Sequence, residues 1–212
     1  MAIEVFDDVF DINYANHIWG FVYNSRFLIG WEDDSIPEHS PFNHMHSNYN
    51  DDDINNLGII SKLLKTPAAK YMEGRQLFKA VVNISSPGQT YFDHTHPDDW
   101  SGSTIKKSPK VLLYYPNLEW KREWGGETMF YTKDNKEIER AVEYRPNRLI
   151  VFDGEHSHRV GTPTAHSPYF RFSLSMFFGK DKITSNTINE YKHSPDYNEG
   201  HDLLALQQRE MF

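Results

Sequence analysis

Two short segments of this chain carry side chains suited to holding one metal ion. Residues 94–98 read His-Thr-His-Pro-Asp, and the second segment ends at His158. Residues two apart in a strand point to the same side, so His94 and His96, or His96 and Asp98, could share an ion with His158. Two histidines and one carboxylate that leave other positions open form the ligand set of non-haem Fe(II) oxygen chemistry. The spacing therefore predicts a mononuclear metal site.

An arginine follows the second segment. Arg171 lies in the apolar run 169–178, and Ser173, two residues on, shares its face if the run is a strand. A buried guanidinium needs an anionic partner. Its planar fork suits a carboxylate, which it can contact through two hydrogen bonds. The sequence therefore predicts a carboxylate site beside the metal site.

The elements that must position these residues are mostly strands. Aromatic residues make up 15% of the chain, which suits a β-rich core. Short apolar runs separated by Gly, Pro, Asn and Asp turns indicate a sandwich or barrel. The runs are 77–84, 90–96, 111–115, 128–132, 139–143, 148–152 and 169–178.

The two ends of the chain differ from this core. Residues 1–73 show helical spacing over 14–23 and 54–64, with a polar loop over 30–50. We predict one domain over 1–179, in which 1–75 form helical support and 76–179 the β core. Residues 180–212 read as a polar C-terminal tail, in which 202–212 could form a short helix.

Charge and composition narrow the partners. The net charge of −8 argues against broad binding to nucleic acid or to an anionic membrane surface. The chain has no cysteine, so a metal must be held by His, Asp or Glu. It shows no signal peptide and no apolar stretch of membrane-spanning length. We expect a cytoplasmic, soluble protein, and the sequence leaves its oligomeric state open.

The stretch from about Gly88 to Phe178 resembles the iron(II)- and 2-oxoglutarate-dependent oxygenases, in particular the prolyl-4-hydroxylase-like branch found in bacteria and tailed phages. The motifs occur in the family's order, although each is weak alone. They read Pro87-Gly88-Gln89-Thr90-Tyr91, Leu112-Leu113-Tyr114-Tyr115-Pro116-Asn117, Trp120, Gly125-Gly126-Glu127-Thr128-Met129-Phe130, Phe152-Asp153-Gly154, His158 and Arg171-Phe172-Ser173. The family fold is a double-stranded β-helix (jelly roll), and we expect it here with N-terminal helices packed on it.

The resemblance implies the cofactors and the reaction. The expected cofactors are Fe(II), 2-oxoglutarate as co-substrate and O2, and the expected reaction is a hydroxylation that releases succinate and CO2. Arg171 and Ser173 would bind the far carboxylate of 2-oxoglutarate. By the same resemblance, Tyr115 would add a hydroxyl to it, and Tyr91 would line the pocket.

One position departs from the family pattern. Counting from Gly88 gives His94 as the first ligand and puts His96 in place of the family's aspartate, so that the centre has three histidines. Counting from an intact His-x-Asp gives His96 and Asp98, but places Pro97 in a strand, where it can donate no ladder hydrogen bond. Both registers use His96 and His158. The choice between His94 and Asp98 stays open.

Two other functions fit parts of the pattern. Gly88, His94 and His96 also resemble the first motif of cupin-like metal proteins, which would use three histidines without 2-oxoglutarate, although the usual glutamate is missing. A non-catalytic jelly-roll module would bind no tight metal. For the oxygenase, the substrate is open between peptidyl proline, another protein side chain and a small molecule.

Overall fold

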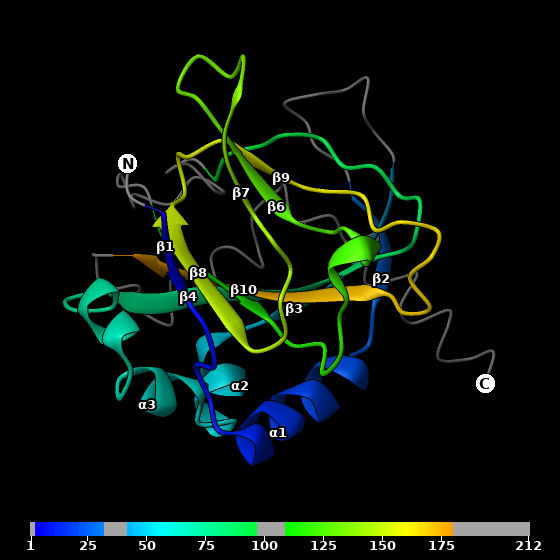
Figure 1. Cartoon of the computed structure of the whole chain (residues 1–212). Helices are drawn as coiled ribbons and strands as arrows, with labels where there is room; N and C mark the ends of the chain where they lie inside the picture. Colours follow the sequence, from blue (N-terminus) through cyan, green and yellow to red (C-terminus); the bar gives the residue numbers. More distant parts are fainter. Residues whose placement is uncertain (1–2, 32–41, 97–108, 180–212) are drawn as a thin grey trace.

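The computed structural model describes residues 3–31, 42–96 and 109–179, so the predictions for Asp98 and for the tail 180–212 lie outside the described residues. Two antiparallel sheets face one another, and the helices lie on the outer side of the larger sheet (Figure 1). The larger sheet has the strand order β1 (Glu4–Phe6), β8 (Arg148–Asp153), β5 (Lys110–Tyr115), β10 (Arg171–Gly179), β4 (Gln76–Ser85), β3 (Phe42–Tyr49), β2 (Leu28–Trp31). The smaller sheet has the order β7 (Ile138–Val142), β6 (Thr128–Tyr131), β9 (His158–Val160).

This arrangement confirms the expected jelly roll. Five of the predicted runs form β4, β5, β6, β7 and β8, and the run 169–178 forms β10. Strand β10 is buried along its whole length between β5 and β4, although Arg171, Ser173 and Ser175 alternate with apolar residues along it.

Alternation along β10 separates two cores. Phe172, Leu174 and Met176 belong to a cluster under the helices. Phe177 belongs to the cluster between the two sheets, and Arg171 shares its side of the strand, because residues with odd numbers here point the same way. The carboxylate site predicted from the sequence is therefore inside the roll.

The helices cover the outer face of the larger sheet (Figure 1). They are α1 (Ile12–Tyr23), α2 (Asp51–Asn56) and α3 (Ile59–Leu63), with the 3-10 helices η2 (Pro67–Tyr71) and η3 (Arg122–Trp124). Helix α2 begins with a reciprocal cap, in which Asn50 Oδ1 accepts from the backbone of Asp53 at 2.9 Å and Asp53 Oδ2 accepts from that of Asn50 at 3.1 Å. No helix in the described ranges has the length and apolar character to cross a membrane.

The prediction of a mostly helical segment over 1–73 is wrong in part. It holds α1, α2 and α3, but also β1, β2 and β3, which form both edges of the larger sheet. Strand β3 lies within the expected loop 30–50. Its alternate positions, among them His44 and His46, are polar although they face the inside of the roll, opposite to Met45 and Tyr49. Strand β3 was therefore predicted as a loop because its sequence is polar.

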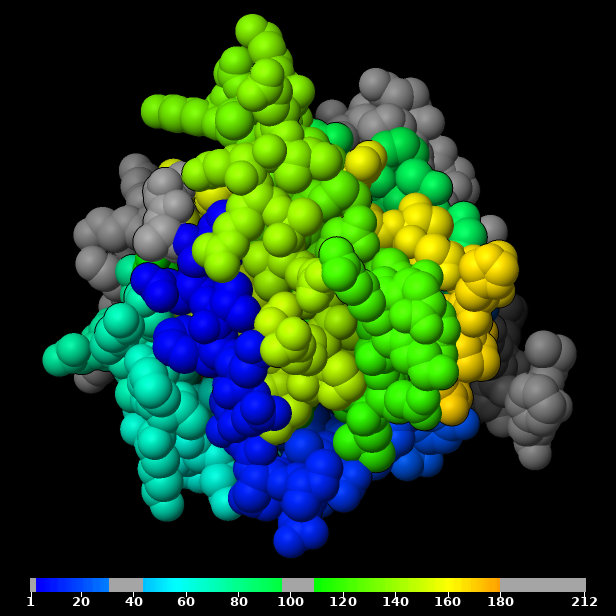
Figure 2. All heavy atoms as spheres, in the orientation of Figure 1, coloured from blue at the N-terminus to red at the C-terminus, as the bar shows by residue number. Residues whose placement is uncertain are grey.

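The strand expected over 90–96 does not form. His94 makes only an isolated bridge with His158. The segment still follows β9, because Gly88 donates to Pro163 O at 2.8 Å and His96 to Gly154 O at 2.7 Å. The exposed turn between β6 and β7 projects from the surface at the top of the view in Figure 2.

Candidate active site

Three histidines come together at one end of the roll. Ring nitrogens of His94, His96 and His158 all lie within 4.8 Å of one another. The ring centroids are 4.5 Å apart for His94 and His158, and 5.0 Å apart for each of the other two pairs. His158 begins β9, and the other two lie on the segment bridged to it. The backbone thus brings both predicted segments to one point.

The rings are oriented as metal ligands require. His158 Nδ1 lies 2.8 Å from the carbonyl of His156, and His94 Nδ1 lies 3.3 Å from that of Phe92. A carbonyl can only accept, so these nitrogens donate, which leaves the Nε2 lone pairs available for a metal ion. The tautomer is thereby fixed on two of the three rings.

Burial favours the neutral form of two of the three histidines. It lowers the pKa of His96 and His158 well below the usual value, and the neighbouring His94 lowers both further. A neutral imidazole is the form that binds metal. The donor set therefore fits a divalent ion such as iron. Asp98, the alternative third ligand, stays a prediction, because it lies outside the described residues.

Arg171 is buried inside the roll with part of its guanidinium unused. The residue is 1% exposed. Nε donates to Gly126 O at 2.7 Å and Nη2 to Thr128 Oγ1 at 3.3 Å. Nη1 is buried and has no hydrogen-bond partner among the described residues. A buried cation with an unused donor needs an anion, so this geometry fits the carboxylate expected here.

A glycine makes room for this arginine. Gly126 has a φ of 77°, and a Cβ placed there would lie 3.0 Å from Arg171 Cδ. The residue is therefore glycine both for its backbone conformation and for close approach. Gly126 thus lets the backbone pass close to the Arg171 side chain.

Two tyrosine rings pack beside the Arg171 guanidinium. Tyr115 and Tyr144 stack with centroids 4.2 Å apart, and the Arg171 guanidinium carbon lies 5.0 and 4.9 Å from their respective centroids. Tyr115 also shares a 2.5 Å hydrogen bond with Thr128. Its neighbour Tyr114 points into the other core, as alternation requires. Tyr144 and Thr128 are site residues that the sequence reading did not single out.

The other two predicted carboxylate-site residues are also buried. Ser173 is 2% exposed and shares the inward side of β10 with Arg171. Tyr91 is 6% exposed, and its hydroxyl donates to Ile84 O at 3.0 Å. Both line the inside of the roll, and their roles stay predictions.

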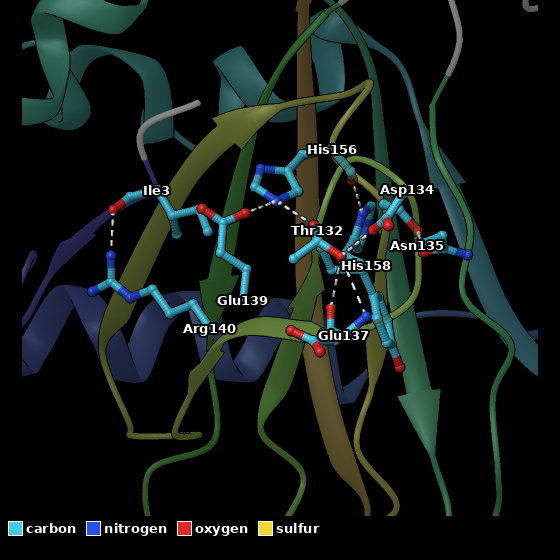
Figure 3. A network of polar contacts seen from close by, with 11 residues as sticks. Ile3, Thr132, Asp134, Asn135, Glu137, Glu139, Arg140, His156 and His158 are labelled. Atoms are coloured by element: carbon cyan, nitrogen blue, oxygen red, sulfur yellow. Dashed lines mark hydrogen bonds and ion pairs between the residues drawn. The ribbon is translucent and has the colours of Figure 1, made fainter.

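His156 stands apart from the metal cluster. Its Nε2 lies 3.1 Å from Tyr131 O and 3.3 Å from a carboxylate oxygen of Glu139 (Figure 3). It is not among the three grouped histidines. Its contribution is the carbonyl that orients His158.

Polar residues of β3 and β4 adjoin the cluster. His44 Nε2 lies 2.9 Å from Asn83 Oδ1. Burial lowers the pKa of His44 to about 4, and His94 adds to that effect. Lys79 pairs in register with Phe177, whose ring packs 4.8 Å from that of His96. Burial lowers the pKa of Lys79 to about 8. The sequence gave no sign of Lys79, because it sits in an apolar run.

Known proteins share this fold and pattern. The profile of the 2OG-Fe(II) oxygenase superfamily matches residues 80–179. No curated protein sequence matches the chain. Among solved structures, a Pseudomonas putida prolyl-4-hydroxylase is similar at 14% identity and a TM-score of 0.54, over 85% of this chain and 93% of that one.

Two further structures extend the similarity. A Trichoplax adhaerens prolyl hydroxylase in complex with a hypoxia-inducible-factor peptide fragment has 16% identity and a TM-score of 0.57, over 84% and 83% of the two chains. HygX from Streptomyces hygroscopicus, with nickel and 2-oxoglutarate bound, has 10% identity and a TM-score of 0.57, over 86% and 84%. At such identities the likeness concerns the fold.

Proposed function

We propose that this chain is an iron(II)- and 2-oxoglutarate-dependent oxygenase, because the profile of that superfamily matches residues 80–179, and that the following residues hold the two cofactors. His94, His96 and His158 hold the iron. Arg171, with Tyr115 and Ser173 beside it, binds the far carboxylate of 2-oxoglutarate, and Tyr91 lines the pocket. The observation that carries the proposal is the unused, buried Nη1 of Arg171 inside the same roll as the histidine cluster.

The protein's own residues place the reactants and exclude water. When bound, iron and 2-oxoglutarate couple oxidative decarboxylation, which gives succinate and CO2, to hydroxylation of a C–H bond of the prime substrate. The three histidines leave the other positions of an ion open. The aromatic walls around Arg171 keep its contact with the carboxylate dry, which strengthens it.

We infer an aliphatic carbon as the site of hydroxylation, on a peptide or a small molecule. The prolyl hydroxylases of similar fold favour peptidyl proline. The epimerase SnoN, which has a similar fold and was solved in complex with α-ketoglutarate and nogalamycin RO, supports the alternative of a small-molecule substrate.

Anaerobic titration of the Fe(II)-loaded protein with 2-oxoglutarate tests the assignment. We expect the weak visible charge-transfer band of the chelate. His158→Ala should abolish Fe(II) binding and the band, whereas the exposed His17→Ala should change neither. Metal affinity that survives in His158→Ala would overturn the iron site, and bound metal without a band would favour the cupin-like alternative.

A further inference from the structure

We propose that Asn135, in the turn between β6 and β7, is a positioning residue of the iron site. Its side chain ties together the two segments of the chain that carry His94 and His158. The inference rests on the proposed function, which places these two histidines on the iron. It gives the exposed turn a role beyond that of joining two strands.

Asn135 contacts the residue that precedes each of the two histidines. Its amide nitrogen donates a hydrogen bond to a carboxylate oxygen of Asp93, and its amide oxygen accepts one from the Ser157 hydroxyl at 2.8 Å. Asp93 directly precedes His94 in the chain. Ser157 directly precedes His158. One amide group therefore joins both segments, in addition to the backbone bridge between the histidines themselves.

The turn holds Asn135 in one conformation (Figure 3). The amide of Asn135 donates to Thr132 O at 2.8 Å, and the amide of Thr132 donates to Glu137 O at 2.9 Å. The Thr132 hydroxyl also donates to Asp134 Oδ1 at 2.7 Å. Asn135 has a φ of 58°, in the left-handed region that asparagine adopts more readily than most residues with a side chain. A closed, hydrogen-bonded turn thus presents the Asn135 amide to the two segments.

The same hairpin also supports the segment of His158 by a second route. His156 Nε2 lies 3.1 Å from Tyr131 O in β6. The carbonyl of His156 lies 2.8 Å from His158 Nδ1 and orients that ring. Asn135 extends the support of the hairpin to the segment of His94. The two segments are therefore held in a common frame by β6 and the turn that follows it.

This frame should matter for metal affinity, because a ligand set tolerates little displacement. Hydrogen bonds behind the ligands of a metal site fix the positions of the ligands and raise affinity. Removal of the Asn135 side chain would leave the backbone bridge between His94 and His158 in place. The segments before the two histidines would then be free to move apart at the turn. We expect looser metal binding in a protein that is still folded.

A glycine at position 135 separates positioning from folding. Glycine suits the left-handed backbone, so Asn135→Gly should keep the urea midpoint of the metal-free protein at or above that of the wild type. Its Kd for Co(II), an optical probe that binds the same kinds of ligand as iron, should rise about tenfold. The matched control is Asp8→Gly, because Asp8 is also exposed and has a φ of 51°. It should leave the Kd unchanged.

An exchange of the two side chains tests the link itself. The double variant Asp93→Asn with Asn135→Asp keeps the net charge and reverses the amide–carboxylate pair. Its Kd for Co(II) should lie within about a factor of two of the wild-type value.

Four outcomes would overturn the inference. They are a wild-type Kd in Asn135→Gly; an equal rise in Asp8→Gly; a rise that comes with a lower urea midpoint, which would make Asn135 a residue of the fold only; and a Kd in the exchange variant as weak as that of Asn135→Gly. A wild type that binds no Co(II) would overturn the iron site itself, and the inference with it. Variants that bind like the wild type would overturn the inference alone.

Discussion

Two halves of the same sheet face carry side chains of opposite character. Toward β8 and β5, inward positions such as Val111, Leu113, Ile150 and Phe152 pack against the smaller sheet. Toward β10, β4 and β3, inward positions are mostly Arg, Ser, Lys, Asn and His, with the apolar Val81 and Phe177 among them. In the first half, the inward side chains pack against the smaller sheet, which excludes water. The second half lies beside the histidine cluster. The comparison suggests that one half stabilises the roll and the other binds ligands.

The largest expected effect separates stability from binding. Ile150 is fully buried in the apolar half. Ile150→Ala should lower the free energy of unfolding by about 2–5 kcal/mol, because it leaves a cavity, whereas the exposed Ile12→Ala should cost little. Denaturant titration measures both. The affinity of the folded protein for 2-oxoglutarate should not change, and a parallel loss of affinity would break the division.

The converse test removes a side chain from the polar half of the sheet face and measures ligand affinity. Arg171→Ala should weaken 2-oxoglutarate binding by about 2–3 kcal/mol, since it removes a charge-assisted contact in a dry site. That corresponds to a factor of roughly 30 to 150 in Kd, while Fe(II) binding stays. Titration of the charge-transfer band measures it, with the exposed Arg122→Ala as the control. An unaltered Kd would place the anion site elsewhere.

A smaller effect concerns pH. The pKa of His44 is lowered by burial from 6.5 to about 4, so the unfolded chain takes up a proton that the folded metal-free protein does not. The contribution of His44 to the free energy of unfolding is therefore fully present above pH 6.5, and it decreases as the pH falls from 6.5 toward 4. The loss is on the order of 1 kcal/mol per pH unit. Urea titrations at pH 7 and 5.5 should show a shallower decline for His44→Gln. An equal decline would mean that His44 is not held neutral.

The smallest expected effect concerns Tyr144, whose ring lies beside the Arg171 guanidinium. Tyr144→Leu removes a ring beside the Arg171 guanidinium, a contact of roughly 1–2 kcal/mol when desolvated, so Kd for 2-oxoglutarate should rise several-fold. Tyr144→Phe keeps the ring and should keep the affinity. It loses the hydrogen bonds of the hydroxyl to Asn117 and Phe172, so it should lower stability. Equal affinity in both variants and the wild type would remove Tyr144 from the site.

The sequence predicted the parts of the site that lie in a family motif or in a run of apolar residues. Strand β10 was readable because it is buried on both faces, and His158 and Arg171 because each stands in a recognisable context. Strand β3 was missed because a site, not a core, covers its inward face. Tyr144 and Lys79 were missed because their meaning depends on strand pairing, which joins residues far apart in the chain. The role of each predicted ligand stays a prediction.

The backbone bridge between His94 and His158 has a consequence for how metal is acquired. Each residue donates its amide to the other's carbonyl, at 2.9 and 3.0 Å, so the two proposed ligands are held together by backbone hydrogen bonds. In small zinc domains, by contrast, metal binding must offset the conformational entropy that the chain loses on ordering, so these domains fold only when the metal binds. Here the chain around the two histidines is already ordered when the protein folds. Metal should therefore enter and leave a folded protein, and its removal by a chelator should leave the far-ultraviolet circular dichroism spectrum unchanged.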